Sequence, residues 1–331
     1  MIAADRRAVA TWLFICAAFT FATVVVGGIT RLTESGLSIV EWQPIVGALP
    51  PLHQSDWEAL FGKYRETPQY QKVFSEIGLE GFKRIFWWEY VHRLLGRVIG
   101  LVFLVPFIYF YLKSRLSRSL TWKLAGLFVL GGLQGALGWY MVQSGLVDDP
   151  RVSHFRLTAH LGLALLIFCG ELWLGLDLLK PQTSSQKKLP LLVLGVVFLM
   201  ALVGGFVAGL RAGHAYNSFP LMNGHLIPPE AFMLEPWWRN FLWNPATVQL
   251  VHRALFWLLL VLVPLLWWQA RRTPAKVAAH HLLALFVLQS SLGIATLLLE
   301  VPIPLAAMHQ AGAVLLLAAA LWTAHAFPRR E

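Results

Sequence analysis

The amino-acid sequence predicts an all-α integral membrane protein of eight transmembrane helices, arranged as two related four-helix bundles. The first observation is composition: the 331 residues are 57% hydrophobic and 13% charged, whereas soluble domains carry roughly 25% charged residues. The second is a set of eight apolar segments, each long enough to cross a bilayer. The third is a repeat of the same motifs, in the same order, in the two halves of the chain.

A helix needs about 20 apolar residues to cross a bilayer, and eight segments meet this length. We expect helices at about 8–29, 88–112, 122–144, 155–179, 190–210, 246–269, 278–299 and 303–326. Only Glu300-Val301-Pro302 separates the last two helices, so we expect a tight hairpin there. The first apolar run is too long for a cleaved signal peptide, and we therefore expect it to remain as the first transmembrane helix.

Basic residues predict the orientation in the membrane, because short cytoplasmic loops collect Lys and Arg. They gather at the two ends of the chain and in every second loop. The clusters are Arg6-Arg7, Lys113/Arg115/Arg118/Lys123, Lys180/Lys187/Lys188, Arg271/Arg272/Lys276 and Arg329-Arg330. Both termini are therefore predicted in the cytoplasm, and the long loops at about 30–87 and 211–245 outside. The net charge of +10 is then a sign of topology and not of nucleic-acid binding.

The two halves of the chain repeat each other. Gly27-Gly28 at the end of the first helix corresponds to Gly204-Gly205 in the fifth, and LQGALG (133–138) corresponds to LQSSLG (288–293). The histidines follow the same order: His92 and His160 in the first half, His252 and His309 in the second. We infer two bundles, at 1–180 and 190–331, related by a pseudo-twofold axis along the membrane normal.

These four histidines are the leading candidates for a functional site, because ionisable residues inside membrane helices are costly and usually functional. In each half, one histidine comes from the second helix and one from the fourth, at similar depth. Two imidazoles on facing helices suit a heme with two axial histidines. The alternative is that each histidine only bonds a neighbouring carbonyl or anchors at the interface. Zinc fits poorly, because each half offers two ligands and the two cysteines lie in apolar runs.

Charged neighbours of the histidines suggest further roles. Arg93 and Arg253 directly follow His92 and His252, and Arg97 lies one turn beyond Arg93. Arginine binds carboxylates through paired donors, so these side chains are candidates for heme propionates. Snorkelling to the headgroups is the alternative for Arg97.

The halves differ three residues before the first histidine of each pair. Glu89 stands before His92, whereas Gln249 stands before His252. A carboxylate can move a proton or stabilise positive charge, and an amide cannot replace it in proton chemistry. We therefore predict a division of labour between the halves, in which the half with Glu89 can perform proton chemistry. The alternative is that Glu89 only pairs with Arg93 or with a histidine.

Several stretches together resemble the heme A synthase family. They are GGITRLTESGLSIVEWQPIVGALPP (27–51), EYVHRLLGR (89–97), LQGALGWYMVQSGL (133–146), RLTAHLGLALL (156–166), AGHAYNSFPLMNG (212–224), LVHR (250–253), LQSSLGIATLL (288–298) and MHQAGA (308–313). The match spans nearly the whole chain in order. Because no cysteine pair stands in an outer loop, the chain resembles the cysteine-poor branch shared by proteobacteria and mitochondria.

The resemblance implies an oxidoreductase that converts the C8 methyl group of heme O into the formyl group of heme A, which terminal oxidases use. It implies that His92 and His160 face the substrate heme O, and that His252 and His309 ligate a heme b cofactor. Glu89 matches the essential acid of the family. The implied location is the bacterial plasma membrane, with heme O synthase and terminal oxidase assembly factors as candidate partners. Oligomeric state stays open.

Two other functions compete at this point. A membrane cytochrome b that only transfers electrons would explain the four histidines but would leave Glu89 without a task. A transporter would suit duplicated bundles, but it would need a polar site at the midplane with broken helices. The histidines near the outer surface disfavour the transporter, and Glu89 disfavours the electron-transfer cytochrome.

Overall fold

The structure is a computed structural model that describes residues 3–43, 46–180 and 188–327. Within these ranges every regular element is a helix, apart from one isolated β-bridge between Met222 and His225. Eight helices are long and apolar enough to cross a membrane, which confirms the predicted fold class. They are α1 (Ala3–Leu32), α4 (Leu79–Leu112), α5 (Arg118–Gln143), α6 (His154–Leu179), α7 (Lys188–Gly209), α9 (Pro245–Ala270), α10 (Lys276–Leu298) and α11 (Ile303–Ala326). The basic residues Lys187, Arg329 and Arg330, used above for topology, lie outside the described ranges.

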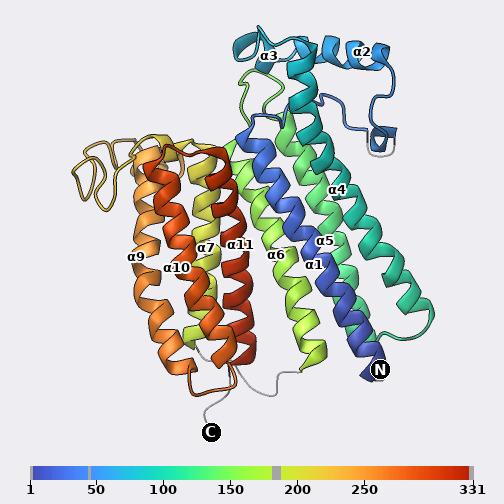
Figure 1. Ribbon diagram of the computed structural model, residues 1–331, viewed down its shortest axis with the longest axis vertical. Helices are drawn as coiled ribbons and strands as arrows, with labels where there is room; N and C mark the ends of the chain where they lie inside the picture. Colours follow the sequence, from blue (N-terminus) through green and yellow to red (C-terminus); the bar gives the residue numbers. More distant parts are fainter. Residues whose placement is uncertain (1–2, 44–45, 181–187, 328–331) are drawn as a thin grey trace. The chain divides into compact units, whose positions relative to one another are not determined.

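The second long helix begins earlier than its apolar run suggested. The sequence predicted a start at about residue 88, whereas α4 begins at Leu79. Its first turns carry Glu80, Lys83 and Arg84, which hydropathy excludes from a membrane span. The helix therefore continues beyond the apolar run, and the short helices α2 (Gln54–Arg65) and α3 (Pro68–Lys72) lie beside this extension (Figure 1).

Aromatic packing holds this extension together. Trp57 and Tyr64 of α2 contact Phe82 and Phe86 of α4, with the rings of Trp57 and Phe86 4.9 Å apart and edge to face. Such pairs add roughly 0.5–1.5 kcal/mol each beyond area burial. The hydroxyl of Tyr90, one turn further along α4, donates to the Ala48 carbonyl at 2.7 Å. The first outer loop is thus a packed cap on α4.

The chain divides into two compact units, Met1–Glu171 and Leu172–Glu331. In the first unit α1 packs along α4, and α5 packs beside α4. The N-terminus lies at the end of this unit opposite to α2 and α3 (Figure 1). In the second unit α7 packs along α9 and α11, and α10 packs against α11 and α9. The functional division into bundles at 1–180 and 190–331 stays a prediction.

The predicted hairpin between the last two helices is confirmed. α10 ends at Leu298 and α11 begins at Ile303. Glu300 and Val301 both take left-handed backbone angles, with φ of 59° and 62°, and the Val301 N–H closes the turn on the Thr296 carbonyl at 2.8 Å. A β-branched residue rarely adopts this region, so the turn is fixed by the two helices that it joins.

Candidate functional site

Each unit brings its two predicted histidines together. In the first unit His92 of α4 and His160 of α6 lie close enough to interact electrostatically. In the second unit the same holds for His252 of α9 and His309 of α11. The pairing inferred from the repeated motifs therefore corresponds to proximity within each bundle.

Every one of the four imidazoles lies against a glycine of a neighbouring helix. A Cβ built on that glycine would approach the histidine Cε1. The pairs are Gly27 with His92 at 2.8 Å, Gly138 with His160 at 2.9 Å, Gly204 with His252 at 3.5 Å and Gly293 with His309 at 2.7 Å. The distances at Gly27, Gly138 and Gly293 are shorter than real Cβ contacts allow. A larger residue at these three positions would therefore displace the imidazole ring beside it.

The hydrogen bonding of the rings repeats as well. Each ring interacts with the backbone of the residue four positions before its glycine: Thr23 for His92, Gln134 for His160, Met200 for His252 and Gln289 for His309. The Nδ1 atom of each ring is buried and has no hydrogen-bond partner. Iron-bound histidines commonly have one nitrogen held by a carbonyl while the other binds the metal. The four residues therefore fit two pairs of axial ligands.

Two glutamines hydrogen-bond the backbone of the histidines in α6 and α11. The amide of Gln134 in α5 donates to the His160 carbonyl at 3.0 Å. The amide of Gln289 in α10 donates to the His309 carbonyl at 2.9 Å. A Cβ on Gly312 would collide with the Gln289 amide oxygen, so this glycine makes room for the glutamine. The LQ motifs of the sequence are thus supports of the histidine layer.

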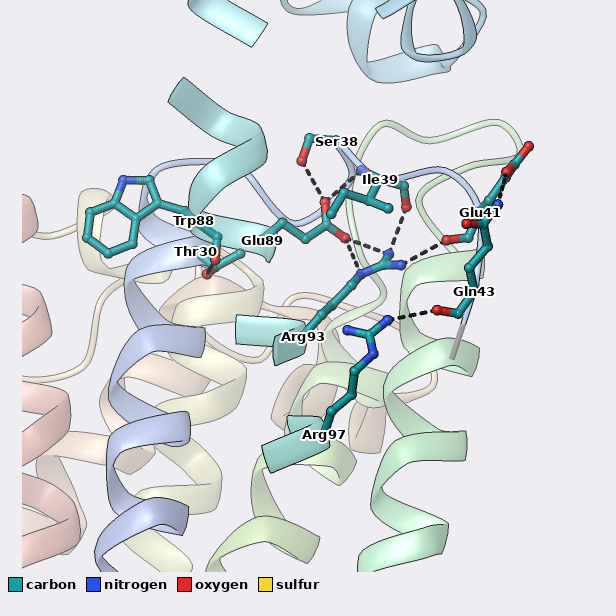
Figure 2. Close-up of polar contacts among 9 residues, drawn as sticks. All are labelled: Thr30, Ser38, Ile39, Glu41, Gln43, Trp88, Glu89, Arg93 and Arg97. Carbon is teal, nitrogen blue, oxygen red and sulfur yellow. Dashed lines mark hydrogen bonds and ion pairs between the residues drawn. The ribbon is translucent and has the colours of Figure 1, made fainter. Parts of the chain in front are cut away.

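Glu89 is a buried carboxylate with a complete set of donors (Figure 2). Its Oε2 accepts from the Ser38 hydroxyl at 2.7 Å and from the Ile39 N–H at 2.8 Å. Its Oε1 accepts from Arg93, from Nη2 at 2.7 Å and from Nε at 3.1 Å. Charge-assisted hydrogen bonds of this kind are stronger than bonds between neutral groups. Glu89 therefore does pair with Arg93, and the same carboxylate also ties the outer loop to α4.

The arginines predicted to bind propionates hold that loop as well. Arg93 donates to the Ile39 carbonyl at 2.7 Å and to the Glu41 carbonyl at 3.0 Å. Arg97 donates to the Gln43 carbonyl at 2.8 Å. Figure 2 shows both guanidinium groups pointing from α4 towards this segment. In this segment both arginines bond backbone carbonyls, and their role in binding propionates stays a prediction.

The second unit repeats this arrangement with an amide. Gln249, 3% exposed, donates to the Ala212 carbonyl at 2.7 Å and accepts from Arg253 Nη2 at 3.0 Å. Arg253 also donates to the carbonyls of Tyr216, Pro220 and Leu221 at 3.1–3.3 Å. Both units therefore use the same two positions to hold an outer loop. The carboxylate of the first unit is the chemical difference between them.

A buried phenol lies close to this carboxylate in the first unit. Burial raises the pKa of Tyr64, and the negative charges of Glu89 and Glu34 raise this pKa further. The phenol therefore stays protonated and donates to Gln69 Oε1 at 3.1 Å, while the Gln69 amide donates to the Glu34 carbonyl at 2.8 Å. Tyr64 and Gln69 thus tie the aromatic cap to the segment after α1 that also supplies donors to Glu89.

The sequence predicted the four histidines, Glu89 and the arginines as site residues, but it did not predict the glycine contacts beneath the rings. The repeat already indicated that these glycines matter, because both Gly-Gly pairs and both LQ motifs recur in the two halves. Ser38 and Ile39 were also missed. They are distant from Glu89 in sequence, and a loop of this length gives no periodic signal for its contacts.

Comparison with known proteins assigns the chain to a family. Residues 10–321 match the cytochrome oxidase assembly protein family. The heme A synthase of Nitrosospira multiformis is 57% identical over 339 residues, which cover 99% of this chain and 95% of the relative. Those of Nitrosomonas eutropha and Parvibaculum lavamentivorans are 53% and 49% identical, covering 96% and 97% of this chain and 93% and 95% of the relatives.

The chain belongs to the heme A synthase family. This confirms the family resemblance that the sequence motifs indicated. For a multi-pass membrane protein of this family, the two histidine pairs are the residues suited to hold heme.

Proposed function

We propose that the protein oxidises the C8 methyl group of heme O to the formyl group of heme A, as a membrane oxidoreductase serving terminal oxidase biogenesis. The observation that carries this proposal is the pair of matching histidine layers, in which Glu89 stands three residues before His92 and Gln249 stands three residues before His252. Relatives named heme A synthase over the whole chain length support it. The substrate is expected from a heme O synthase, which is a candidate partner.

The two units take different roles in this proposal. His92 and His160 would hold the substrate heme O, and Arg93 and Arg97 would bind its propionates. His252 and His309 would hold heme b, and Arg253 would bind its propionates. Because the reacting atom is a methyl group at the ring edge, two axial histidines do not block it. The rings are positioned by the glycines and by the backbone contacts described above.

Glu89 is the proposed catalytic group. Conversion of a methyl group to a formyl group with an oxygen atom from water releases protons and electrons. A carboxylate at the substrate edge can accept protons, and the electrons would pass to an acceptor outside the protein. To reach a substrate atom, Glu89 must exchange at least one of its four donors, and Arg93 must release carbonyls to bind a propionate. The loop at Ser38–Gln43 would therefore rearrange when substrate binds. When bound, heme b supplies a one-electron redox centre.

Heme analysis of cells tests this function directly. The protein is co-expressed with a heme O synthase, and extracted hemes are separated and identified by pyridine hemochrome spectra. Heme A should appear only when both proteins are present. A cytochrome b that only transfers electrons would change its redox state with quinol and leave heme O unchanged, and that result would overturn the proposal.

The glycine contacts give a prediction with a built-in control. Gly293→Ala should displace His309, because its Cβ would lie 2.7 Å from Cε1, and heme b content should fall severalfold. Gly204→Ala should retain heme b, because the corresponding 3.5 Å is an ordinary contact. Both changes favour the helix by up to about 1 kcal/mol, so helix propensity cannot explain a difference. Equal heme b content per protein in the purified variants would contradict the assigned packing.

The proposed orientation places both termini in the cytoplasm. Reporter fusions at Ser114 and Thr273, in loops flanked by Arg115 and Arg272, should be active only with a cytoplasmic reporter. A fusion at Asn223 should be active only with an exported phosphatase. Phosphatase activity at Ser114 would reverse the orientation and move the histidine layers to the cytoplasmic side.

A further inference from the structure

A buried carboxyl group lies in the first unit, away from the histidine layer. Glu171 of α6 is 1% exposed. The Thr20 hydroxyl of α1, itself 6% exposed, donates to Glu171 Oε2 at 2.9 Å. The buried thiol of Cys16, one turn from Thr20, also interacts electrostatically with Glu171. These three side chains form a polar layer, which we call the Glu171 layer.

The Glu171 layer is separate from the proposed heme O site. Glu171 lies eleven residues beyond His160 in α6, which is about 16 Å along the axis of an α-helix. Thr20 lies seven residues before Gly27, the glycine beneath His92, or about 10 Å along α1. The direction is towards the end of α1 that begins at Ala3. None of the residue roles proposed above uses this layer.

The second unit provides an internal comparison. The contacts Gly27–His92 and Gly204–His252 align α1 with α7, and His160 and His309 align α6 with α11. On this alignment Cys16, Thr20 and Glu171 correspond to Val193, Val197 and Ala320. All three counterparts are buried and apolar. The fold therefore packs this layer without polar groups, and the half that has Glu89 is the half that has Glu171.

The surroundings of Glu171 favour a neutral carboxylic acid. Among the described residues, no ion pair involves Glu171, and its hydrogen-bond partner is an uncharged hydroxyl. An unpaired carboxylate inside a membrane helix bundle is costly. The other titratable groups nearby are the thiols of Cys16 on α1 and of Cys169, two residues earlier in α6. Neither supplies a positive charge.

We propose that Glu171 and Thr20 form an internal proton-binding site, whose occupancy is linked to the charge of the heme held by His92 and His160. This inference rests on the proposed function. Loss of one electron from the iron to a one-electron acceptor adds a positive charge to the bundle, and one proton leaves the Glu171 carboxyl for water. Gain of one electron reverses both changes. Opposite charges attract over this range because the bundle interior screens them weakly.

The first test asks whether Glu171 holds a proton. The full-length wild-type protein, in lipid nanodiscs at neutral pH, is treated with dicyclohexylcarbodiimide, which reacts with protonated carboxyl groups in apolar surroundings. Mass spectrometry should locate the adduct on Glu171 and not on Asp177 of the same helix, whose side chain is 42% exposed. Wild-type protein without an adduct on Glu171 would overturn the proposal, and this result does not depend on any variant.

The second test asks whether the proton is linked to the heme. The midpoint potential of the first-half heme is titrated against pH with soluble redox mediators. In wild type and in the control Asp177→Asn, the potential should fall as pH rises. In Glu171→Gln the midpoint potential should depend less on pH. Thr20→Val keeps the carboxyl group, so the potential should still change with pH, but over a different pH range. An unchanged slope in Glu171→Gln would overturn the linkage.

The two tests separate this inference from the function on which it rests. If the first half held no heme, the proposed function and the linkage would both fail. An adduct on Glu171 would still establish the proton-binding site. If heme A is made normally and Glu171 carries no adduct, the function stands and the Glu171 inference falls.

Discussion

Glu89→Gln is expected to retain heme b and to accumulate heme O, or a partly oxidised product, in place of heme A. The substitution makes the first unit copy the second, where Gln249 fits beside Arg253 in an equivalent arrangement. An amide keeps one acceptor oxygen but removes the negative charge and the ability to take up a proton. Extracted hemes, normalised to purified protein, measure the effect, and the heme A yield should fall by at least tenfold.

Protein level must be measured alongside the products. Glu89 accepts four hydrogen bonds, and an amide leaves at least one donor unpaired, at a cost of about 1–3 kcal/mol. The reciprocal variant Gln249→Glu is the matched control. It should leave product identity unchanged and at most lower the potential of heme b, because a nearby negative charge favours oxidised iron. A normal heme A yield from Glu89→Gln would show that the carboxylate is structural.

The helices were predictable because a bilayer imposes a strong constraint on sequence. An apolar run of about 20 residues has few other structures open to it, so all eight spans lie where hydropathy placed them. The constraint ends at the membrane surface. Leu79–Trp87 is helical because it packs under α2, and its charged residues hid this from a hydropathy argument. The cap formed by α2 and α3 was likewise read only as a loop.

The candidate site was predictable where it repeats. Four histidines at matching positions pointed to two pairs, and the structure brings each pair together. The repeat did not predict in which direction the Glu89 side chain points. Glu89 shares a helix face with His92 in sequence, yet its carboxylate bonds Ser38 and Ile39 of the outer loop. Those contacts depend on how the loop folds over α4, and a single sequence carries no periodic signal for that.

The division of labour also requires that the second half hold heme b through both of its histidines. His252→Ala and His309→Ala should each remove the six-coordinate low-spin spectrum and most of the bound heme b, because each removes one of two axial ligands. Absorption spectra of the reduced purified protein measure this. His280→Ala is the control, since His280 is exposed on α10 of the same unit, bonds the Lys276 carbonyl of its own helix and lies beside the ring of Trp267. It should keep the spectrum. A wild-type spectrum in both His252→Ala and His309→Ala would show that other residues bind heme b. Gly204 and Gly293, which lie beside these rings, would then serve packing alone.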